Sequence, residues 1–345
     1  MKKVTVIGLF RNGLDAADGQ SVKTRIVTQE LELLLGSNDV QRVDTYGWKK
    51  HPWKLLLSCV KAVLCSRNVV FMTDAGGINV FPWLLVLSNF LKRTKLHYVV
   101  IGGWLIQSLD NDPVRKFWLS KLDAIYVETQ TMKSGMEKKG LPNVVIMPNC
   151  KRLQFLEKAE LTFPTEAPFR LCTFSRVMRE KGIEDAVRAV QEINQRHGQQ
   201  VYSLDIYGQV DADQVEWFER LKREFPQEVR YCGIVPYDQS TSVMKQYFAL
   251  LFPTKFYTEG IPGTVIDSYA AGVPVISSRW ESYCDIVDDE TGFGYSFDDA
   301  EGLLTVLEDI ASNPDLVNDK RVGCLQRAKM YTPESVIEIL VSKLR

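Results

Sequence analysis

Two carboxylates bracket a glycine-rich turn in the second half of the chain. Glu259 precedes the turn, and Asp267 stands eight positions later inside a helical pattern that Gly272 ends. Glycines let backbone N–H groups come close to a ligand, and the amino end of the helix behind them favours negative charge. The segment therefore predicts a turn that faces a phosphate or a sugar. The turn itself consists of Gly260, Ile261, Pro262, Gly263 and Thr264.

The spacing of the two acids bears on their chemistry. The acid/base pair of a glycoside hydrolase needs carboxyl groups about 5 to 9.5 Å apart. Eight residues of helix span about 12 Å, so a pair that grips two ends of one elongated ligand fits better. An alternative stays open, in which Glu259 is a solvated loop residue and Asp267 is a charge on the helix surface.

The segment from Glu259 to Ile276 resembles the E-x7-E signature of family 4 glycosyltransferases of the GT-B fold. Its end, from Ala270 to Ile276, is similar to the A-x-G-x-P-V-I ending of that family. The resemblance implies that Glu259 lies beside the donor sugar and that Asp267 accepts hydrogen bonds from the ribose hydroxyls. Aspartate stands where the family has glutamate, which shortens the reach to the ribose by one methylene group.

A second segment, from Phe174 to Gly182, lies where a predicted strand ends and a helix begins. It resembles the G-R-x-x-x-x-K-G element of the same family, whose Arg and Lys neutralise the donor diphosphate. Arg176 and Lys181 match those positions. Negative charge accumulates on a leaving diphosphate, and fixed cations can stabilise it without a metal. The resemblance thus implies Arg176, Lys181 and Glu259 as catalytic residues. Without it, the two cations would be ordinary solvated charges.

Weaker resemblances add further donor-binding candidates. Gly208 follows the second strand of the expected donor domain, and Val235 follows the third, in a loop that commonly contacts the base in relatives. In the segment from Asp18 to Ser21, Gly19 matches one member of a Gly-Gly pair that opens the first helix in many relatives. Ser21 is equally well interpreted as a helix N-cap.

One departure from the family concerns the mechanism. Gly102 and Gly103 follow the fourth predicted strand, where many relatives carry a histidine near the reacting sugar. They let the backbone approach the donor or the acceptor, or they form a tight turn. No catalytic histidine is assigned, because the three histidines of the chain do not match that position: His51, His97 and His197.

Short apolar strands alternate with amphipathic helices along the whole chain, and these elements must position the motifs. This order predicts parallel sheets with helices on both faces. Strands are predicted at 4–10, 42–46, 69–73, 97–101, 124–128, 144–147, 170–174, 204–207, 229–232, 249–252 and 273–277. Helices are predicted at 21–35, 52–65, 80–91 and 214–225.

The pattern divides the chain into two Rossmann-like domains. Residues 151–169 interrupt the alternation with charges and two prolines, and they are interpreted as a linker. The predicted fold is α/β, GT-B, with two domains that face each other across a cleft. Residues 1–160 form the expected acceptor-binding domain and residues 161–330 the nucleotide-sugar donor-binding domain. Residues 331–345 form a C-terminal helix expected to pack back toward the first domain.

The total charge conceals an asymmetry between the two parts. Residues 1–165 contain 23 basic and 14 acidic residues, and the remainder contains 19 and 29. Such a split indicates that the parts face different partners, although unequal surfaces also arise by chance. An anionic membrane surface is therefore an expected partner of the N-terminal part. Nucleic acid is not expected, because no interleaved aromatic and basic motif is present.

The remaining features of the sequence bear on the cellular compartment and on the need for a metal or a cofactor. The seven scattered cysteines are interpreted as buried hydrophobic residues in a reducing compartment. Residues 4–10 are interpreted as a strand rather than as part of a signal peptide. We expect a cytoplasmic protein, with peripheral attachment to the inner face of the plasma membrane. No metal and no cofactor are expected, because Asp110–Asp112 and Asp211–Asp213 spell DxD at predicted helix starts and are interpreted as caps.

The predicted activity is retaining transfer of a sugar from a nucleotide diphosphate donor to a saccharide or lipid-linked saccharide acceptor. The resemblance implies a role in surface polysaccharide biosynthesis. Two alternatives stay open. One is a nucleotide-sugar epimerase or hydrolase of the same architecture, and the other is a noncatalytic nucleotide-sugar sensor.

Overall fold

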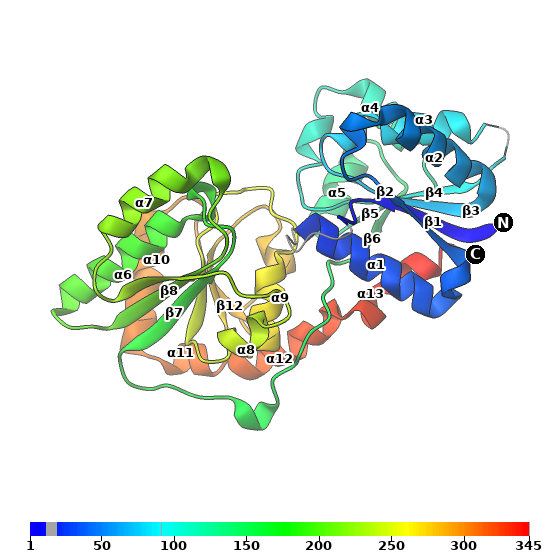
Figure 1. Ribbon diagram of the computed structural model, residues 1–345. Helices are drawn as coiled ribbons and strands as arrows, with labels where there is room; N and C mark the ends of the chain where they lie inside the picture. The colour runs from blue at the N-terminus through cyan, green and yellow to red at the C-terminus, as the bar shows by residue number, and fades with distance from the viewer. Residues whose placement is uncertain (12–18, 91, 345) are drawn as a thin grey trace. The chain divides into compact units, whose positions relative to one another are not determined.

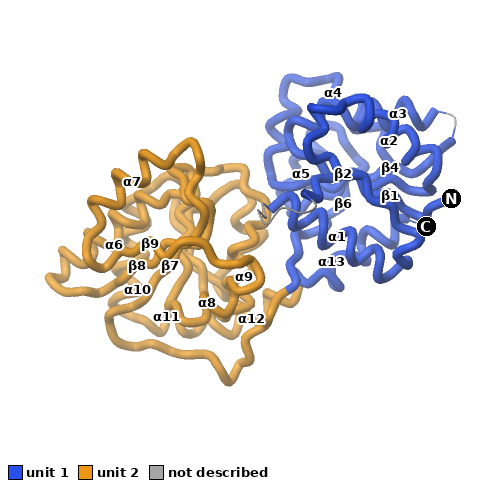
Figure 2. The backbone as a smooth tube through the Cα atoms, viewed as in Figure 1, with its two compact units in different colours: residues 1–152, 331–345 blue, residues 153–330 orange. Residues whose placement is uncertain are grey.

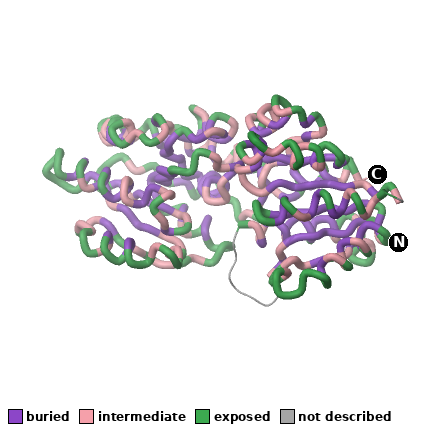
Figure 3. Tube along the Cα trace, turned by 90° about the horizontal axis from the view of Figure 1, so that it is seen from above, coloured by how far each residue is buried: buried purple, intermediate pink, exposed green. Residues whose placement is uncertain are grey.

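The computed structural model describes residues 1–11, 19–90 and 92–344, and the chain forms two compact units. Unit 1 comprises residues 1–152 and 331–345, and unit 2 comprises residues 153–330 (Figure 2). In both units the strands are largely buried, whereas the outer turns are exposed (Figure 3). Each unit therefore has its own core and is described by itself.

Unit 1 contains a six-stranded sheet in which neighbouring strands run parallel (Figure 1). One face packs on the helices α2 to α5, and the other packs on α1 and α13. The strands in spatial order are β2 (Val40–Asp44), β1 (Lys2–Gly8), β3 (Ser66–Met72), β4 (Lys95–Val99), β5 (Ala124–Val127) and β6 (Val144–Ile146). The helices are α1 (Gly19–Leu35), α2 (Pro52–Cys65), α3 (Phe81–Ser88), α4 (Pro113–Leu119), α5 (Gln130–Lys138) and α13 (Pro333–Val341).

Unit 2 repeats the same architecture with a second six-stranded parallel sheet. The strands in spatial order are β12 (Gly292–Tyr295), β11 (Val275–Ser278), β10 (Ala249–Phe252), β7 (Phe169–Phe174), β8 (Tyr202–Tyr207) and β9 (Val229–Gly233). The helices are α6 (Ile183–His197), α7 (Val215–Arg223), α8 (Ser240–Met244), α9 (Gly263–Ala270), α10 (Ala300–Ser312), α11 (Asp315–Asn318) and α12 (Arg321–Ala328).

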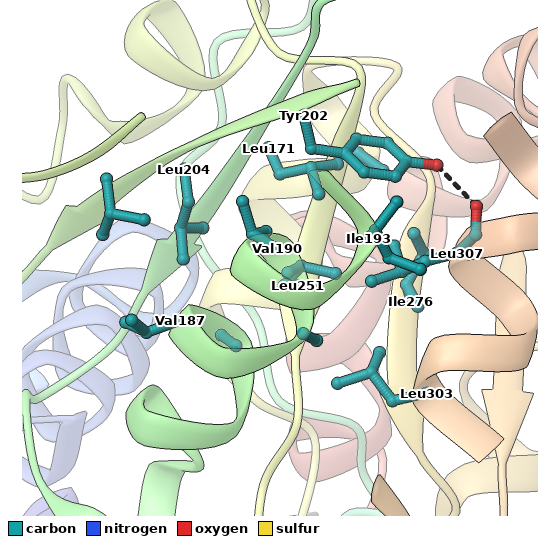
Figure 4. Packing of buried hydrophobic residues seen from close by; sticks show 14 of the residues in the cluster. Leu171, Val187, Val190, Ile193, Tyr202, Leu204, Leu251, Ile276, Leu303 and Leu307 are labelled. Atoms are coloured by element: carbon teal, nitrogen blue, oxygen red, sulfur yellow. Dashed lines mark hydrogen bonds between the residues drawn. The ribbon is translucent and has the colours of Figure 1, made fainter. Parts of the chain in front are cut away.

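The core of unit 2 forms where α6 and α10 cover the sheet. Val187, Val190 and Ile193 of α6 point at Leu204 and its neighbours on the strands (Figure 4). This pattern follows the spacing of three and four residues by which a helix buries one stripe. The hydroxyl of Tyr202 donates to the Leu307 carbonyl oxygen at 2.7 Å, so its buried oxygen is satisfied (Figure 4).

Each predicted strand has a counterpart, with ends that differ by up to three residues, and β12 is an additional strand. Of the predicted helices, 52–65 has the predicted bounds, whereas 21–35 begins at Gly19. The predicted helix 80–91 ends at Ser88, and its predicted last residue, Leu91, lies outside the described residues. The predicted helix 214–225 occurs as α7, which the 3-10 helix η7 (Ala212–Gln214) precedes.

The predicted linker belongs largely to unit 2. The structure divides the chain after Arg152 rather than after residue 160. Leu156 and Leu161 are buried on unit 2, and the Leu156 amide donates to the Ala270 carbonyl oxygen at 2.9 Å. Leu161 packs so closely on Gly272 that a Cβ there would come within 2.4 Å of it. Two apolar side chains thus hold this charged segment on unit 2.

The C-terminal segment belongs to unit 1. Val336, Ile337 and Leu340 of α13 are buried in one cluster with residues of β1 and α1. The backbone joins the ends of this unit as well, because the Lys151 amide donates to the Tyr331 carbonyl oxygen at 3.0 Å. The last helix is therefore part of the N-terminal core.

The cysteines behave as predicted only in part. Cys59, Cys150, Cys172 and Cys324 are buried, and burial raises the pKa of the Cys59 thiol to about 12. The prediction of burial is wrong for three others, which are exposed at the end of α2, on the edge strand β9 and in a 3-10 turn: Cys65, Cys232 and Cys284. Among residues 1–11, 19–90 and 92–344, no helix combines the length and the apolar composition needed to cross a membrane.

Candidate donor-sugar site

The sheet of unit 2 reverses its strand order between β7 and β10. From β7 the chain continues to β8 and β9 on one side, and β10, β11 and β12 extend the other side. In open parallel sheets, ligands bind outside the carboxyl ends of the strands at such a point. Both sequence motifs follow these two strands, since Arg176 to Lys181 come after β7 and the Glu259 loop comes after β10. The topology therefore brings the motifs together.

Lys181 and Glu259 form an ion pair at this point. Their side chains are only 17% and 15% exposed, so neither is a freely solvated charge. Thr254, directly behind β10, donates from its hydroxyl to the same oxygen of Glu259 at 3.1 Å. The structure thus contradicts the alternative in which Glu259 is a solvated loop residue.

Aromatic rings fix the ammonium group of Lys181. Its Nζ lies 4.9 Å from the ring centre of Phe256 and 5.5 Å from that of Phe252. A cation over an aromatic face is attracted by the ring quadrupole. Lys181 is therefore held at the edge of the sheet, where an anionic ligand would meet a preorganised positive charge.

Gly182 explains how the two loops come so close. It has φ +68°, and a Cβ there would lie 1.8 Å from the Pro253 carbonyl oxygen. Next to it, the Lys255 amide donates to the Glu180 carbonyl oxygen at 2.8 Å. Only glycine allows this contact without movement of the backbone. The Lys-Gly pair of the motif therefore has a structural reason, since the glycine lets Lys181 reach Glu259.

Arg176 has a different environment. Its side chain is 56% exposed and pairs with Asp211 at 3.4 Å. Asp211 also caps η7, because its side chain accepts from the Asp213 amide at 3.0 Å. The predicted cap is thus confirmed, and so is the cap at Asp112, which accepts from the Arg115 amide at 2.7 Å. Arg176 remains an exposed cation beside the switch point.

The glycine-rich turn leads directly into α9. Gly260 and Ile261 are buried, and Pro262 is the N-cap residue of the helix. The first amides of a helix have no carbonyl partner within it, so this end can receive an anion. The hydroxyl of Thr264 in the first turn is buried and has no hydrogen-bond partner among the described residues, which marks a polar group available to a ligand.

Asp267 lies on the buried side of α9. The alternative that it is a charge on the helix surface is therefore wrong. Gly208 fits closely against the loop after β7, because it has φ +136° and a Cβ there would lie 1.7 Å from the Ser175 carbonyl oxygen. Val235 is partly exposed in the loop after β9.

The other predicted donor contacts belong to unit 1. Gly19 is the first residue of α1, and Asp18 of the same motif lies outside the described residues. Gly102, with φ +77°, and Gly103 form a turn behind β4, where the indole of Trp104 donates to the Ile101 carbonyl oxygen at 2.9 Å. This geometry agrees with a tight turn.

The structure adds functional candidates that the sequence analysis missed. Thr254, Phe256 and Asp211 contact the predicted residues directly, and their position just after strands of the sheet was the available signal. In unit 1, Lys23 of α1 and Glu128 after β5 form a buried ion pair, and Lys23 also donates to the Val100 carbonyl oxygen at 3.2 Å. The sequence feature that could have indicated this pair is a lysine, Lys23, on the inner side of an amphipathic helix.

Comparison with known proteins agrees with this geometry. Residues 168–325 match the family model described as glycosyl transferases group 1. The sequence matches no curated protein. Two chains of similar fold are sucrose-phosphate synthase from Thermosynechococcus elongatus and HepE from Anabaena in complex with UDP. The TM-scores are 0.74 and 0.75, the identities 15% and 11%, and the coverage is 99% and 100% of this chain and 98% and 99% of theirs.

A third similar structure is the apo form of the lipopolysaccharide outer core galactosyltransferase WaaB. Its TM-score is 0.72 at 15% identity, over 100% of this chain and 99% of that chain. The two parallel sheets and these similar structures show the GT-B fold of two Rossmann-like domains. More particularly, the chain carries the sequence pattern of glycosyl transferases group 1 in residues 168–325 of unit 2.

Proposed function

We propose that this chain is a retaining, metal-independent glycosyltransferase of family 4. It moves a hexosyl unit from a nucleotide diphosphate sugar to a saccharide or lipid-linked saccharide. The observation that carries the proposal is the Lys181–Glu259 pair at the switch point of unit 2. This pair lies within the residues that match the group 1 family.

The donor side of the site follows from the charges. Lys181 and Arg176 neutralise the diphosphate, together with the amides at the start of α9 and the Thr264 hydroxyl. Fixed donors in a partly buried site stabilise the charge that develops on a leaving group. Glu259 contacts the transferred sugar, and Asp267 holds the ribose. HepE has been solved with UDP and glucose, which supports a uridine nucleotide as the first donor to test.

The reaction exchanges one bond for another. The bond between the anomeric carbon of the sugar and the diphosphate oxygen breaks, and a bond from that carbon to an acceptor oxygen forms on the same face. The proton of the acceptor hydroxyl passes to the leaving diphosphate. The products are therefore a glycosylated acceptor and a free nucleoside diphosphate.

The acceptor is bound by unit 1 in this proposal. WaaB is a lipopolysaccharide galactosyltransferase by its name, which supports an acceptor in surface polysaccharide biosynthesis. Such acceptors are carried on lipids. We therefore place the chain in the cytoplasm, peripherally attached to the inner face of the plasma membrane, where the basic N-terminal part meets anionic lipid.

Thermal unfolding with a panel of nucleotide sugars tests the donor side. A ligand at 100 times its dissociation constant stabilises the folded state by about 2.7 kcal/mol. We expect at least one nucleotide sugar to raise the melting temperature, and Lys181→Gln to reduce that shift. No shift with any nucleotide sugar would contradict the proposal.

Chromatography of the products then separates the alternatives. A transferase yields a larger acceptor and a nucleoside diphosphate. An epimerase yields an isomeric nucleotide sugar. A hydrolase yields free sugar at the same rate with or without an acceptor. A sensor binds the donor without turnover. Any of the last three outcomes with a complete acceptor panel would replace the proposed activity.

A further inference from the structure

Helix α2 is apolar on the side that faces away from the sheet. Leu55, Cys59, Ala62 and Val63 are buried against the core of unit 1. Trp53 and Leu57, on the outward side, are exposed, and Trp53 is 76% exposed. A helix on the surface of a soluble domain normally carries polar residues on its outward side. The outward side of α2 is therefore available for an apolar environment.

The neighbouring helices show the same feature. Trp83 and Leu87 project outward from α3, and Phe90 just beyond its end is 88% exposed. Phe117 of α4 is exposed as well. Helix α2 packs against α3, and α3 packs against α4 (Figure 1). These side chains therefore share one side of unit 1. We call them the outer aromatic face: Trp53, Leu57, Trp83, Leu87, Phe90 and Phe117.

Basic residues border the outer aromatic face. Residues 45–109, which include α2 and α3, contain eight Lys or Arg and a single acidic residue, Asp74. Lys54 and Lys61 lie on the outward side of α2 between the apolar residues, and both are exposed. Lys121 holds its Nζ 4.8 Å from the ring centre of Phe117. The part of the face on α2 and α3 thus combines large apolar side chains with a strong excess of positive charge.

This combination selects one occupant. A second copy of the chain would bring the same positive charge against itself in a two-fold contact, which is repulsive. A nucleic acid would match the charge but would leave the exposed leucines in water. An anionic membrane satisfies both features, because Trp and Phe enter the headgroup boundary while Lys and Arg extend to the phosphates.

We propose that α2, α3 and α4 form a membrane-docking face, on which the outer aromatic face inserts shallowly into an anionic bilayer. This face would attach the chain to the membrane, as the proposed function requires. Only the purpose of the docking, access to a lipid-carried acceptor, rests on the proposed function. The docking itself depends on the side chains of unit 1 and is measured without any sugar donor.

Flotation of the full chain with lipid vesicles tests the inference. We expect binding at low salt to phosphatidylcholine vesicles that contain about 30% phosphatidylglycerol, and weak binding to phosphatidylcholine alone. High salt should reduce binding, because it screens the charges. The double variant Trp53→Ser with Phe90→Ser should reduce the bound fraction about tenfold or more, since each large apolar side chain contributes to insertion.

Matched variants separate this effect from general surface changes. Phe163→Ser removes an exposed phenylalanine of unit 2 and should leave vesicle binding unchanged. The triple variant Lys50→Gln, Lys54→Gln and Lys61→Gln should weaken binding only to the anionic vesicles. Lys158→Gln in unit 2 should have no effect.

Two results would overturn the inference. One is the absence of wild-type binding to anionic vesicles at low salt, and the other is binding that the double variant leaves intact. Self-association that the double variant abolishes, without vesicle binding, would assign the face to a second copy instead. Nucleotide-sugar stabilisation is measured on the same samples. Vesicle binding without any donor effect would refute the proposed function and leave the docking face in place.

Discussion

The ion pair of Lys181 with Glu259 couples the two residues that are expected to contact opposite ends of the bond that breaks. Glu259 holds Lys181 at the edge of the sheet, and Thr254 holds Glu259. Partial burial strengthens such charge interactions relative to water. A donor diphosphate that approaches Lys181 would thus meet a cation whose position is already fixed. Each residue can be tested by removal of its charge at nearly constant size.

The first substitution is Glu259→Gln. It keeps the shape of the side chain but removes the negative charge beside the sugar. If this interaction strengthens in the transition state, kcat should fall by about 100-fold or more, with a smaller effect on donor binding. Steady-state kinetics and donor titration measure the two quantities. Wild-type turnover in this variant would show that Glu259 does not act on the sugar.

The second substitution is Asp267→Asn on the buried side of α9. We expect it to act mainly on donor affinity. Loss of a charged hydrogen bond worth about 1.5 to 3 kcal/mol weakens binding roughly 10- to 150-fold. Calorimetric titration with the nucleoside diphosphate measures this change, and the melting temperature without ligand monitors the fold. A donor dissociation constant equal to that of the wild type would remove Asp267 from the ribose.

Sequence patterns located the charged residues of the site but not their environments. The resemblance to the family 4 motifs indicated Arg176 and Lys181, and the glycine-rich turn together with the same resemblance indicated Glu259. Thr254 has no such pattern, and its contact with Glu259 depends on the strand order of the sheet. The exposure of Arg176 and its pairing with Asp211 depend likewise on where the loops after β7 and β8 lie.

At the scale of elements, two loops behind neighbouring strands form the candidate site. The loop after β7 and the loop after β10 are joined by the Lys255–Glu180 backbone hydrogen bond and by the close approach of Gly182 to Pro253. The position of Lys181 therefore depends on the backbone of both loops. A change at Gly182 should disturb the site without removing any charge.

Gly182→Ala tests this dependence, with Gly198→Ala as its matched control. Both glycines have similar positive φ, +68° and +62°, but no atom in the described part of the chain lies within 4 Å of a Cβ at Gly198. The control should lose about 1 to 2 kcal/mol of unfolding free energy, the ordinary cost of a left-handed residue. Gly182→Ala should lose about 1 to 3 kcal/mol more because the added methyl group meets Pro253.

Denaturant unfolding measures both variants, and the nucleotide-sugar shift is measured beside it. We expect the donor shift to persist in Gly198→Ala and to decrease in Gly182→Ala. Equal stability of the two variants would show that the contact with Pro253 relaxes at no cost.

The elements themselves were largely predictable from the apolar alternation. The predicted strand at residues 97–101 begins two residues too late, because the first residue of β4, Lys95, is polar and lies outside the apolar run. Strand β12 was missed because it is short and contains Gly292 and Gly294, which weaken a strand pattern. Its pairing with β11 makes this segment a strand, which its own sequence does not indicate.

At the scale of the whole molecule, two parallel sheets of the same architecture each place their helices on both faces. The repetition explains why a chain of 345 residues divides into two cores. The alternation predicted this division. The position of the boundary was not predictable from composition. The segment after Arg152 contains charged residues, and nothing in its composition indicates that Leu156 and Leu161 pack on unit 2.

The stability of unit 1 should depend on pH through His97. Burial lowers the pKa of this imidazole to about 4, a shift that Asp123 opposes and Lys95 supports. The unfolded chain takes up the proton near pH 6.5, whereas the folded chain does so only near pH 4. Unfolding free energy should therefore fall as the pH falls through this window, by about 3 kcal/mol at most.

An NMR titration of the histidine side chains measures this directly. The His97 signal is identified because it is missing from the spectrum of His97→Gln. Its chemical shift should show that the imidazole stays neutral well below pH 6. The unfolding free energy of the variant should depend less on pH between 4 and 6.5 than that of the wild type. A pKa near 6.5 for that signal would contradict the burial of a neutral imidazole in the sheet.

In the proposed reaction, the chain transfers a sugar with charges supplied by its own residues. The most direct measurement incubates the full chain with the stabilising nucleotide sugar, a panel of saccharide acceptors and a metal chelator, followed by mass spectrometry. We predict an acceptor that gains one hexose, an equal amount of nucleoside diphosphate, and loss of both products in Lys181→Gln and Glu259→Gln. Transfer that the chelator abolishes and Mn²⁺ or Mg²⁺ restores, or wild-type rates in both variants, would contradict the account.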